Sequence, residues 1–266
     1  MKKEGKCSNT LFKAVVLIFT ALLMLFILGA LSMVFIKGIP NLESSFQTPE
    51  IRFALKLSLF TSFISTFLCI FFAVPIGYGL ARFHFWGEKI IHAVFNIPMA
   101  LPPIVAGIAL LILLGNTEFG HFLESLGLKF VFTVKGIILV QFFINVPYTV
   151  RIIKSTIQEI NPRMEFISRT LGCTNLSSFM HVTLPLAKNG ILASIVITWA
   201  RALGDFGAVL MIAGATRMKT ETLPTSIYLN MSCGDLNTAL SVAAILIIIS
   251  LLSLFVFEML GGKKMY

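Results

Sequence analysis

Arg201 and Asp205 form an ionisable pair inside a long apolar stretch of the sequence, residues 190–213. They stand four residues apart, so on an α-helix they share one face and can neutralise each other. Either charge alone would cost at least about 2.5–3.5 kcal/mol at the centre of a bilayer, so both should face protein or water. Gly204 and Gly207 flank Asp205, and such small residues let another helix approach closely.

Few other residues have the types and spacing that catalysis requires. The four histidines are scattered, no paired carboxylates accompany them, and the four cysteines lack the spacing of metal ligands. The sequence has no Gly-x4-Gly-Lys-Ser/Thr, the loop that cradles nucleotide phosphates. We therefore expect no catalytic residue, metal or cofactor on this chain, and a membrane-embedded enzyme is disfavoured. If ATP drives the protein, another subunit binds it.

The composition is typical of an integral membrane protein. Of the 266 residues, 57% are hydrophobic and only 12% are charged, whereas globular domains average about 25% charged residues. A soluble fold of this size could not cover its surface with so few polar groups. The net charge of +9 does not indicate nucleic acid, because the basic residues fall mostly between the apolar stretches, where membrane topology explains them.

Backbone polar groups in lipid must be bonded internally, so apolar stretches of about 20 residues predict spanning helices. The sequence has six of them, which predicts an all-α integral membrane protein with one transmembrane domain over residues 1–266. The first stretch is too long for a signal peptide and no A-x-A-like cleavage site follows it, so we expect it to be retained. The six stretches are roughly 12–36, 54–81, 94–115, 134–156, 190–213 and 238–259.

Prolines should interrupt two of these helices. Pro98, Pro102 and Pro103 break the third stretch near one end, and Pro147 interrupts the fourth. Such breaks are tolerated at membrane depth where neighbouring helices or a cavity supply new partners for the backbone. Kinks that serve only packing are the alternative.

The distribution of basic residues predicts the orientation. With the N-terminus inside, 13 Lys and Arg residues lie on the inner side and 7 on the outer side. The excess is on the short loops, where the positive-inside rule applies. Both termini should therefore be cytoplasmic, and residues 157–189 should form the largest cytoplasmic loop.

This loop should hold two short amphipathic helices. Asn161 can cap the first, Pro162 suits its first turn, and Gly172 is a natural stop. Thr174 can cap the second, and Leu184-Pro185 should end it, because Pro cannot continue the hydrogen-bond ladder. The predicted faces are Met164, Ile167, Ser168 and Leu171 on the first helix, and Leu176, Phe179, Met180 and Thr183 on the second.

Three interpretations fit such a helix pair. A DNA-binding helix-turn-helix is disfavoured, because both ends of the segment are tethered to membrane spans. A pair lying on the bilayer surface is a stronger alternative. The most specific interpretation is a docking element whose exposed apolar face fits a groove on a cytoplasmic partner.

The spacing Gly172-x9-Val182-x-Leu184-Pro185 resembles the EAA loop of permease subunits of ABC importers. In that family the loop holds the coupling helix that docks onto the ATPase subunit. The sequence departs from the family pattern at the acidic position, where Phe166 stands and Glu165 is one residue earlier; Ile167-Ser168 replace the Ala-Ala pair. The resemblance implies ATPase coupling by Glu165, Arg169, Gly172, Leu176, Phe179, Val182, Leu184 and Pro185.

Four further segments resemble molybdate permeases more closely than importers in general. ARALG-acid-FGA is shared with sulfate permeases, whereas TLP-x-x-IY with a later Gly-Asp is more typical of molybdate permeases. Tungstate permeases are close relatives. The segments are NIPMALPPIVAGIALLILLG (96–115), NVPYTVRIIKSTIQEINPR (145–163), ARALGDFGAVLMIAG (200–214) and TETLPTSIYLNMSCGD (220–235).

The resemblance implies a type I ABC importer permease fold and import of molybdate by alternating access across the cytoplasmic membrane of a prokaryote. It implies a homodimer of about 12 spans, two ATPase subunits that carry ATP and Mg, and an extracytoplasmic molybdate-binding protein. That protein would dock on loops near 37–53, 116–133 and 215–237.

We expect the translocation path or its gate to lie on the face of the fifth stretch at the homodimer interface. A structural ion pair between helices is the alternative role for Arg201 and Asp205. Other functions left open are a sulfate or tungstate permease, a heterodimer with a related permease, and an ATP-independent secondary transporter or channel. The expected path residues are Arg201, Gly204, Asp205, Gly207, Pro102 and Pro103.

Overall fold

The computed structural model describes residues 4–83 and 86–261. The remaining positions, which include His84 and four of the lysines counted for the orientation, lie outside the described residues. All regular structure in the described ranges is helical. The helices are α1 (Glu4–Gly38), η1 (Ile39–Asn41), α2 (Leu42–Gln47), α3 (Pro49–Arg82), α4 (Glu88–Ala100), α5 (Pro103–Gly115), α6 (Glu118–Ser125), α7 (Val134–Glu159), α8 (Pro162–Thr170), α9 (Asn175–Ser178), the π-helical η2 (Phe179–Thr183), α10 (Leu184–Gly204), α11 (Gly207–Ala213), α12 (Leu223–Ser232) and α13 (Leu236–Gly261).

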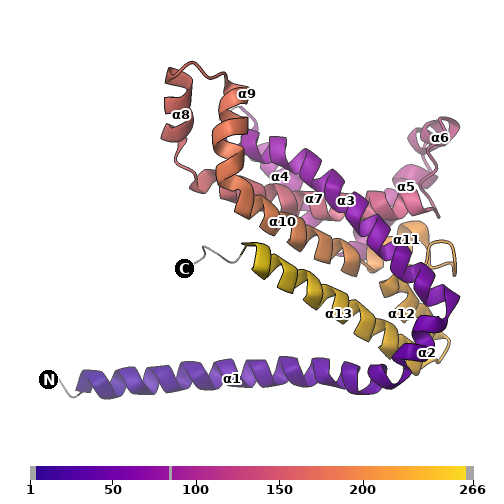
Figure 1. The fold of residues 1–266 in the computed structure, drawn as a ribbon. Helices are drawn as coiled ribbons and strands as arrows, with labels where there is room; N and C mark the ends of the chain where they lie inside the picture. The colour runs from indigo at the N-terminus through magenta and orange to yellow at the C-terminus, as the bar shows by residue number, and fades with distance from the viewer. Residues whose placement is uncertain (1–3, 84–85, 262–266) are drawn as a thin grey trace.

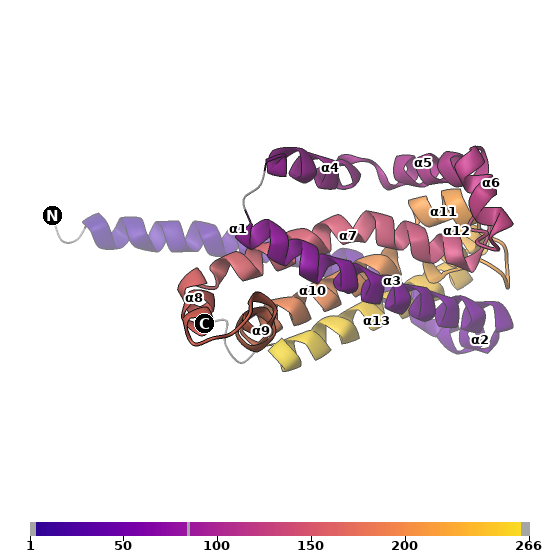
Figure 2. The ribbon, with the colours of Figure 1, turned by 90° about the horizontal axis from the view of Figure 1, so that it is seen from above.

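α3 and α7 pack against each other through the middle of the molecule (Figures 1 and 2). A Cβ atom on Gly77 of α3 would lie 2.9 Å from Cγ2 of Ile153 on α7, so the close approach depends on glycine. Three apolar clusters follow α3. One joins it to α5, α7 and α11 around Ile137, a second to α7 and α10 around Ile153, and a third to α12 and α13 around Leu223.

Within residues 4–83 and 86–261, five helical runs are long and apolar enough to cross a membrane. The predicted stretches 12–36, 54–81, 134–156 and 238–259 each lie inside a helix, and the all-helical prediction is confirmed. Pro98 and Pro147, both expected to break helices, lie inside unbroken α4 and α7. The five runs found among the described residues are Phe12–Gln47, Pro49–Arg82, Val134–Glu159, Asn175–Leu203 and Leu236–Ser253.

The third predicted stretch, 94–115, is not one straight helix. α4 and α5 meet at an angle of 109°, and only if the two are taken together do they count as a sixth span. Leu101 is extended (φ −76°, ψ 140°) because the ring of Pro102 disfavours a helical residue before it. Pro102 and Pro103 therefore make the break that the sequence predicts, but it is a sharp turn.

The fifth predicted stretch, 190–213, is wrong as a single span. α10 ends at Gly204, Asp205 is extended (φ −65°, ψ 121°), and α11 begins at Gly207. Glycines at 204 and 207 have low helix propensity, and a hydrogen bond from Asn145 to Asp205 holds the intervening turn. Apolar periodicity alone did not reveal this break.

The helix ends and loops divide between two opposite ends of the molecule. The start of α1, the end of α13 and the α8–α9 loop lie at one end, and α2, α6 and the loop before α12 lie at the other (Figures 1 and 2). This arrangement agrees with both termini sharing one side of the membrane with the loop 157–189. That this side is cytoplasmic stays a prediction.

Candidate functional site

The loop between α7 and α10 begins and ends its helices largely where the sequence predicts. The Asn161 side chain accepts a hydrogen bond from the Arg163 backbone at 3.0 Å, and the Thr174 hydroxyl accepts one from Ser177 at 3.2 Å. Gly172 has a φ of +96°, a left-handed conformation that glycine adopts at no steric cost. Both caps and the glycine stop are confirmed.

The second loop helix does not end at Leu184-Pro185, contrary to the prediction. α9 continues through the π-helical turn Phe179–Thr183 directly into α10, which has Pro185 in its first turn. A π turn opens the ladder just before the proline, so the ring avoids the clash that it makes within a regular α-helix. The loop's second helix and the fifth span are therefore one helical run, Asn175–Leu203.

Glu165 is buried and anchors the loop to the rest of the protein. Its Oε1 accepts hydrogen bonds from Arg82 Nε at 2.8 Å and from Thr183 Oγ1 at 2.9 Å, and its Oε2 accepts one from the Tyr78 hydroxyl at 3.2 Å. Arg82 also donates to the Ile160 carbonyl at 2.9 Å. The carboxylate thus ties α8 to the end of α3 and to η2, and it points into the protein rather than toward a partner.

The predicted apolar faces are exposed only in part. Phe179 turns inward, where its ring centroid lies 4.6 Å from that of Tyr78. Thr183 is buried against Glu165, and Ser168 donates to Ser178 at 2.6 Å. Helical spacing predicts that these inward residues share a face with their apolar neighbours. It does not predict the buried Glu165 carboxylate, around which they turn inward. The exposed large apolar side chains are Met164, Phe166, Ile167, Leu171, Leu176 and Met180.

The other expected coupling residues surround this surface. Arg169 is exposed and its Nη1 lies 3.4 Å from Asn175 Oδ1. Val182 and Leu184 are half-buried, and Pro185 is exposed. Phe166, at the position where the family pattern has an acidic residue, is 60% exposed. The loop therefore presents an apolar surface above an ionic anchor.

Arg201 and Asp205 are joined through a third residue. Asn145 donates to Asp205 Oδ2 at 2.8 Å, and Arg201 Nε donates to Asn145 Oδ1 at 3.2 Å. No contact within 4.0 Å pairs the two charged groups directly, and the shared helix face that their spacing predicts is not formed. The reason is the end of α10 at Gly204, which takes Asp205 off the helix face. The Arg201 guanidinium carbon also lies 3.8 Å from the centre of the Tyr148 ring, a cation–π contact.

The two glycines beside Asp205 differ in their surroundings. A Cβ on Gly207 would lie 2.8 Å from Ile104 Cγ1 of α5, whereas a Cβ on Gly204 would meet nothing within 4 Å. The close approach expected from small residues is therefore present at Gly207 only. Pro102 and Pro103 are exposed at the turn that leads into α5.

A row of polar residues on α7 was not predicted from the sequence. The side chain of Gln141 donates to the Ala202 carbonyl at 2.8 Å, and the hydroxyls of Thr149 and Thr198 lie 2.8 Å apart. With Asn145 these residues fasten α7 to α10 at the level of Arg201. Their spacing of four residues inside an apolar stretch is the signal that could have found them, because intramembrane polar groups face protein.

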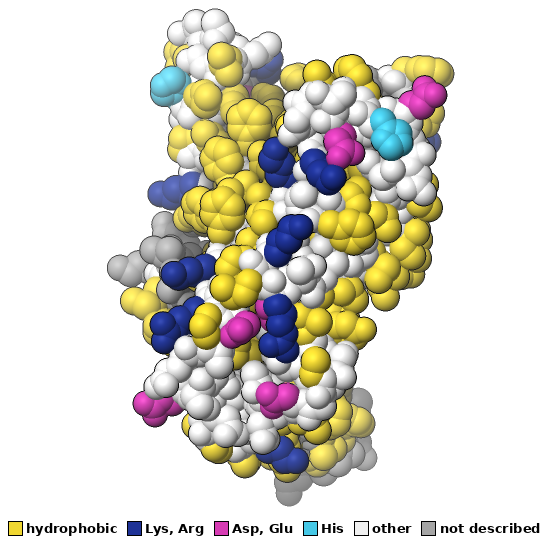
Figure 3. All heavy atoms as spheres, turned by 90° about the vertical axis from the view of Figure 1, so that its right-hand side faces the viewer, with side chains coloured by type: hydrophobic (Ala, Val, Ile, Leu, Met, Phe, Trp, Pro, Cys, Tyr) yellow, Lys and Arg dark blue, Asp and Glu magenta, His cyan; other side chains and the backbone are white. Residues whose placement is uncertain are grey.

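The end of the molecule opposite the α8–α9 loop has mixed charge. Lysine, arginine and acidic side chains are scattered there among hydrophobic ones (Figure 3). Lys129 Nζ lies 2.8 Å from Glu124 Oε1, and the hydrogen bond from that ammonium lowers the pKa of the Glu124 carboxyl. The loops 37–53, 116–133 and 215–237 all lie at this end (Figure 1).

Comparison with known proteins extends over most of the chain. Residues 73–263 match the family described as the binding-protein-dependent transport system inner membrane component. The sulfate transport system permease protein CysT of Salmonella typhimurium is 32% identical over 216 residues, 81% of this chain and 78% of that protein. A probable molybdenum ABC transporter permease protein of Haloferax volcanii is 33% identical over 240 residues, 90% of this chain and 87% of that protein.

The same architecture occurs in solved structures. The crystal structure of a bacterial ABC transporter involved in the import of the acidic polysaccharide alginate contains a chain that superimposes with a TM-score of 0.79. The identity is 15%, and both chains are covered completely, so the likeness is one of fold, that of type I ABC importer permeases. The chain belongs to the family of inner membrane components of binding-protein-dependent transport systems and is the permease subunit of an ABC importer.

Proposed function

We propose that this permease imports molybdate by alternating access coupled to a separate ATPase subunit. Overall similarity does not choose the anion, because sulfate and molybdenum permeases match at 32% and 33% identity. The segment 220–235 supports molybdate, since its Thr-Leu-Pro-x-x-Ile-Tyr pattern resembles molybdate permeases.

The observation that carries this proposal is the position of that segment next to the broken span. Thr222 and Thr225 form a capping box that begins α12. Tyr228 of the same helix lies with its ring centroid 5.5 Å from that of Phe206. Because Phe206 directly follows Asp205, the segment that resembles molybdate permeases contacts the turn where the path is expected.

The exposed apolar surface of the α8–α9 loop is the proposed docking site for the ATPase subunit, which would bind ATP and Mg. Apolar side chains such as Ile167 and Leu171 would enter a groove on that subunit. The run Asn175–Leu203 is continuous, and Glu165 is bonded to Arg82 on α3. A movement of the docked loop would therefore reach α10 and α3 together.

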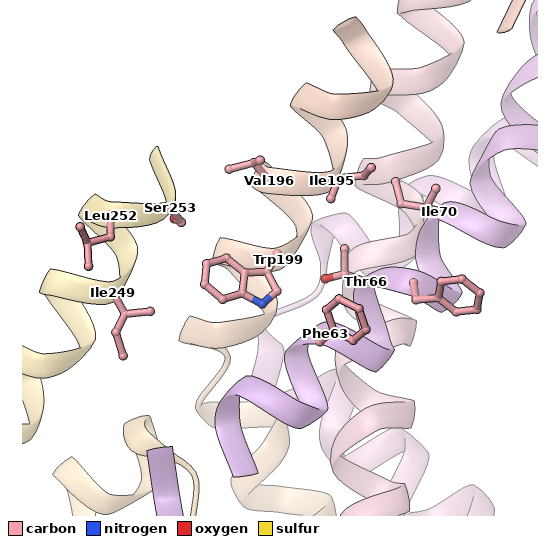
Figure 4. Close-up of a pocket in the computed structure, with 10 residues that line it drawn as sticks. Phe63, Thr66, Ile70, Ile195, Val196, Trp199, Ile249, Leu252 and Ser253 are labelled. Atoms are coloured by element: carbon pink, nitrogen blue, oxygen red, sulfur yellow. The ribbon is translucent and has the colours of Figure 1, made fainter. Parts of the chain in front are cut away.

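A homodimer is supported by apolar surfaces that have no partner among the described residues. In the apolar window of the first span, Phe12–Gln47, no residue is buried. A second apolar surface is a groove of about 580 Å³ between α3, α10 and α13, into which Trp199 and Phe63 project (Figure 4). In the proposed homodimer, a second copy would pack against such surfaces. Two ATPase subunits would then dock below.

Arg201, Gly204, Asp205 and Gly207 would line the path or its gate, beside the turn at Pro102-Pro103. In the described part of the chain Arg201 uses only Nε for a hydrogen bond, so its two terminal nitrogens remain as donors for an oxyanion. An extracytoplasmic molybdate-binding protein would deliver the anion to the loops at the opposite end from α8.

Uptake assays test the anion and the gate separately. Excess molybdate, tungstate and sulfate, each added to cells that take up labelled molybdate, should compete in that order of preference if molybdate is the substrate. Stronger competition by sulfate would favour a sulfate permease, and stronger competition by tungstate a tungstate permease.

Arg201→Ala should abolish uptake, and Arg201→Lys should restore it only partly, because lysine cannot reproduce the planar stacking on Tyr148. If both Arg201 variants assemble normally and take up the anion at the wild-type rate, Arg201 has no part in a gate.

A secondary transporter or channel is the rival from another class. Such a protein would not need the docking loop, so Gly172→Val or deletion of residues 174–183 would leave transport intact. The importer predicts loss of stimulated ATP hydrolysis and of uptake, because valine is strained at a φ of +96°.

A further inference from the structure

A polar cavity of about 670 Å³ opens between α4 and α7, in the half of α7 that leads to α8. This volume is within the range of small-molecule sites, roughly 300–1,000 Å³. Among the described residues that line it, none carries a carboxylate. Its polar lining consists of Asn96 from α4 and of Tyr148, Arg151, Lys154, Ser155 and Gln158 from α7.

The cavity continues the polar row of α7 away from the middle of the membrane. Tyr148 belongs to both regions, since Arg201 lies 3.8 Å from the centre of its ring and the same residue lines the cavity. The Tyr148 hydroxyl donates to the Met99 carbonyl at 3.4 Å, which holds α4 against α7 at this point. Residues 145, 148, 151, 155 and 158 follow at intervals of three or four, so they share one helix face.

We propose that this cavity is a transit site for a tetrahedral oxyanion with two negative charges, occupied after the anion has passed Arg201. The proposal rests on the proposed function and adds to it a second cationic station, formed by this chain alone. The exposed guanidinium of Arg151 presents a planar set of donors that fits two oxygens of such an anion. Ser155, Gln158 and Asn96 add neutral donors.

The chemistry suits passage rather than storage. A transit site must bind weakly enough to release the ion, and the cavity is open on one side, with Arg151, Ser155 and Gln158 exposed. A lipid phosphate is also a tetrahedral anion, but a site for a lipid headgroup would need to lie only at the membrane surface, without a connection to Arg201. Arg201 contacts Tyr148, which also lines the cavity, and this favours an anion that has passed Arg201.

Thiol labelling of Ser155→Cys in the reconstituted complex of permease and ATPase tests the site without requiring transport. An anionic and a cationic methanethiosulfonate are compared, each rate divided by its rate with a free thiol. The positive cavity should favour the anionic reagent roughly tenfold. Arg151→Gln in the same background should remove most of that preference, whereas Lys56→Gln, at an exposed site on α3, should not.

Protection against the anionic reagent identifies the ligand. Molybdate, tungstate or sulfate should slow labelling severalfold, and chloride at equal ionic strength should not. Equal rates for the two reagents, or no protection by any of the three dianions, would overturn the proposal. Vesicles with and without phosphatidylglycerol form a second arm, and protection by that lipid but not by tungstate would also overturn it.

Transport assays then separate this site from the identity of the substrate. Arg151→Gln should lower uptake roughly tenfold while ATP hydrolysis stimulated by the loaded binding protein changes less than uptake, because the charge acts on the anion; Arg151→Lys should recover part of the loss. Uptake at the wild-type rate in Arg151→Gln contradicts the transit site. If sulfate rather than molybdate protects and is transported, the substrate assignment fails and the site stands.

Discussion

The carboxylate of Glu165 accepts a hydrogen bond from Nε of Arg82 at 2.8 Å, which joins α8, the first helix of the α8–α9 loop, to the end of α3. The two side chains are 7% and 9% exposed. Removing one partner from such a pair typically costs about 3–5 kcal/mol, because the other charge stays buried without compensation. The pair is therefore a mechanical link whose loss should be measurable.

Glu165→Gln should lower both the thermal stability of the purified subunit and its stimulation of ATP hydrolysis. Arg82→Gln should do the same, and the double substitution should lose less than the sum of the two, since it leaves no buried charge unpaired. Glu159→Gln, at the exposed end of α7, is the matched control and should behave like the parent. Additive losses would contradict a direct link between Glu165 and Arg82.

The exposed ring of Phe166 should contribute to binding of the ATPase subunit. Phe166→Ser should weaken binding of the two subunits, measured by copurification, about tenfold to a hundredfold, because burying such a side chain contributes about 1.5–3 kcal/mol. Phe122→Ser removes a ring of similar exposure (59% against 60%) at the opposite end of the molecule. If both substitutions weaken copurification equally, Phe166 does not contact the ATPase.

Asn145 should be needed to hold Arg201 and Asp205 in their positions. Asn145→Ala removes both bonds, and uptake should fall roughly tenfold or more, since hydrogen bonds to charged groups contribute about 1.5–3 kcal/mol each. Asn189→Ala on the exposed face of α10 serves as control. Uptake by Asn145→Ala at the control rate would show that the bridge has no part in transport.

The thermal stability of alanine variants at three glycines should follow the space that is available for a Cβ atom at each position. A Cβ on Gly107 would lie 2.7 Å from the backbone oxygen of Ala208, one on Gly207 would meet the side chain of Ile104, and one on Gly204 would meet nothing. Overpacking costs about 1–3 kcal/mol, and a side chain can move more easily than backbone. Thermal unfolding in detergent should therefore show Gly107→Ala least stable, then Gly207→Ala, with Gly204→Ala close to the parent; a reversed order contradicts the α5–α11 packing.

Local features of the loop could be predicted because they depend on a few neighbouring residues. Asn161, Gly172 and Thr174 act through their own side-chain oxygen or their own φ, and each lies where it was expected. The long apolar helices follow likewise from the need to bond every backbone group internally.

Features that depend on distant partners could not be predicted in this way. Glu165 turns inward because of Arg82, 83 positions earlier in the chain, and Asp205 leaves the helix beside Asn145, 60 positions earlier. The continuation of the helix through Pro185 depends on a π turn for which the sequence pattern has no signal.

We propose that this chain is the permease subunit of a molybdate importer driven by ATP. The most direct test is ATP hydrolysis by the reconstituted permease–ATPase complex, with the binding protein loaded with molybdate, tungstate or sulfate. We expect molybdate to give the largest stimulation, and substitutions at Glu165 to reduce it. Stimulation by sulfate alone, or hydrolysis unaffected by any of the three anions, would contradict that claim.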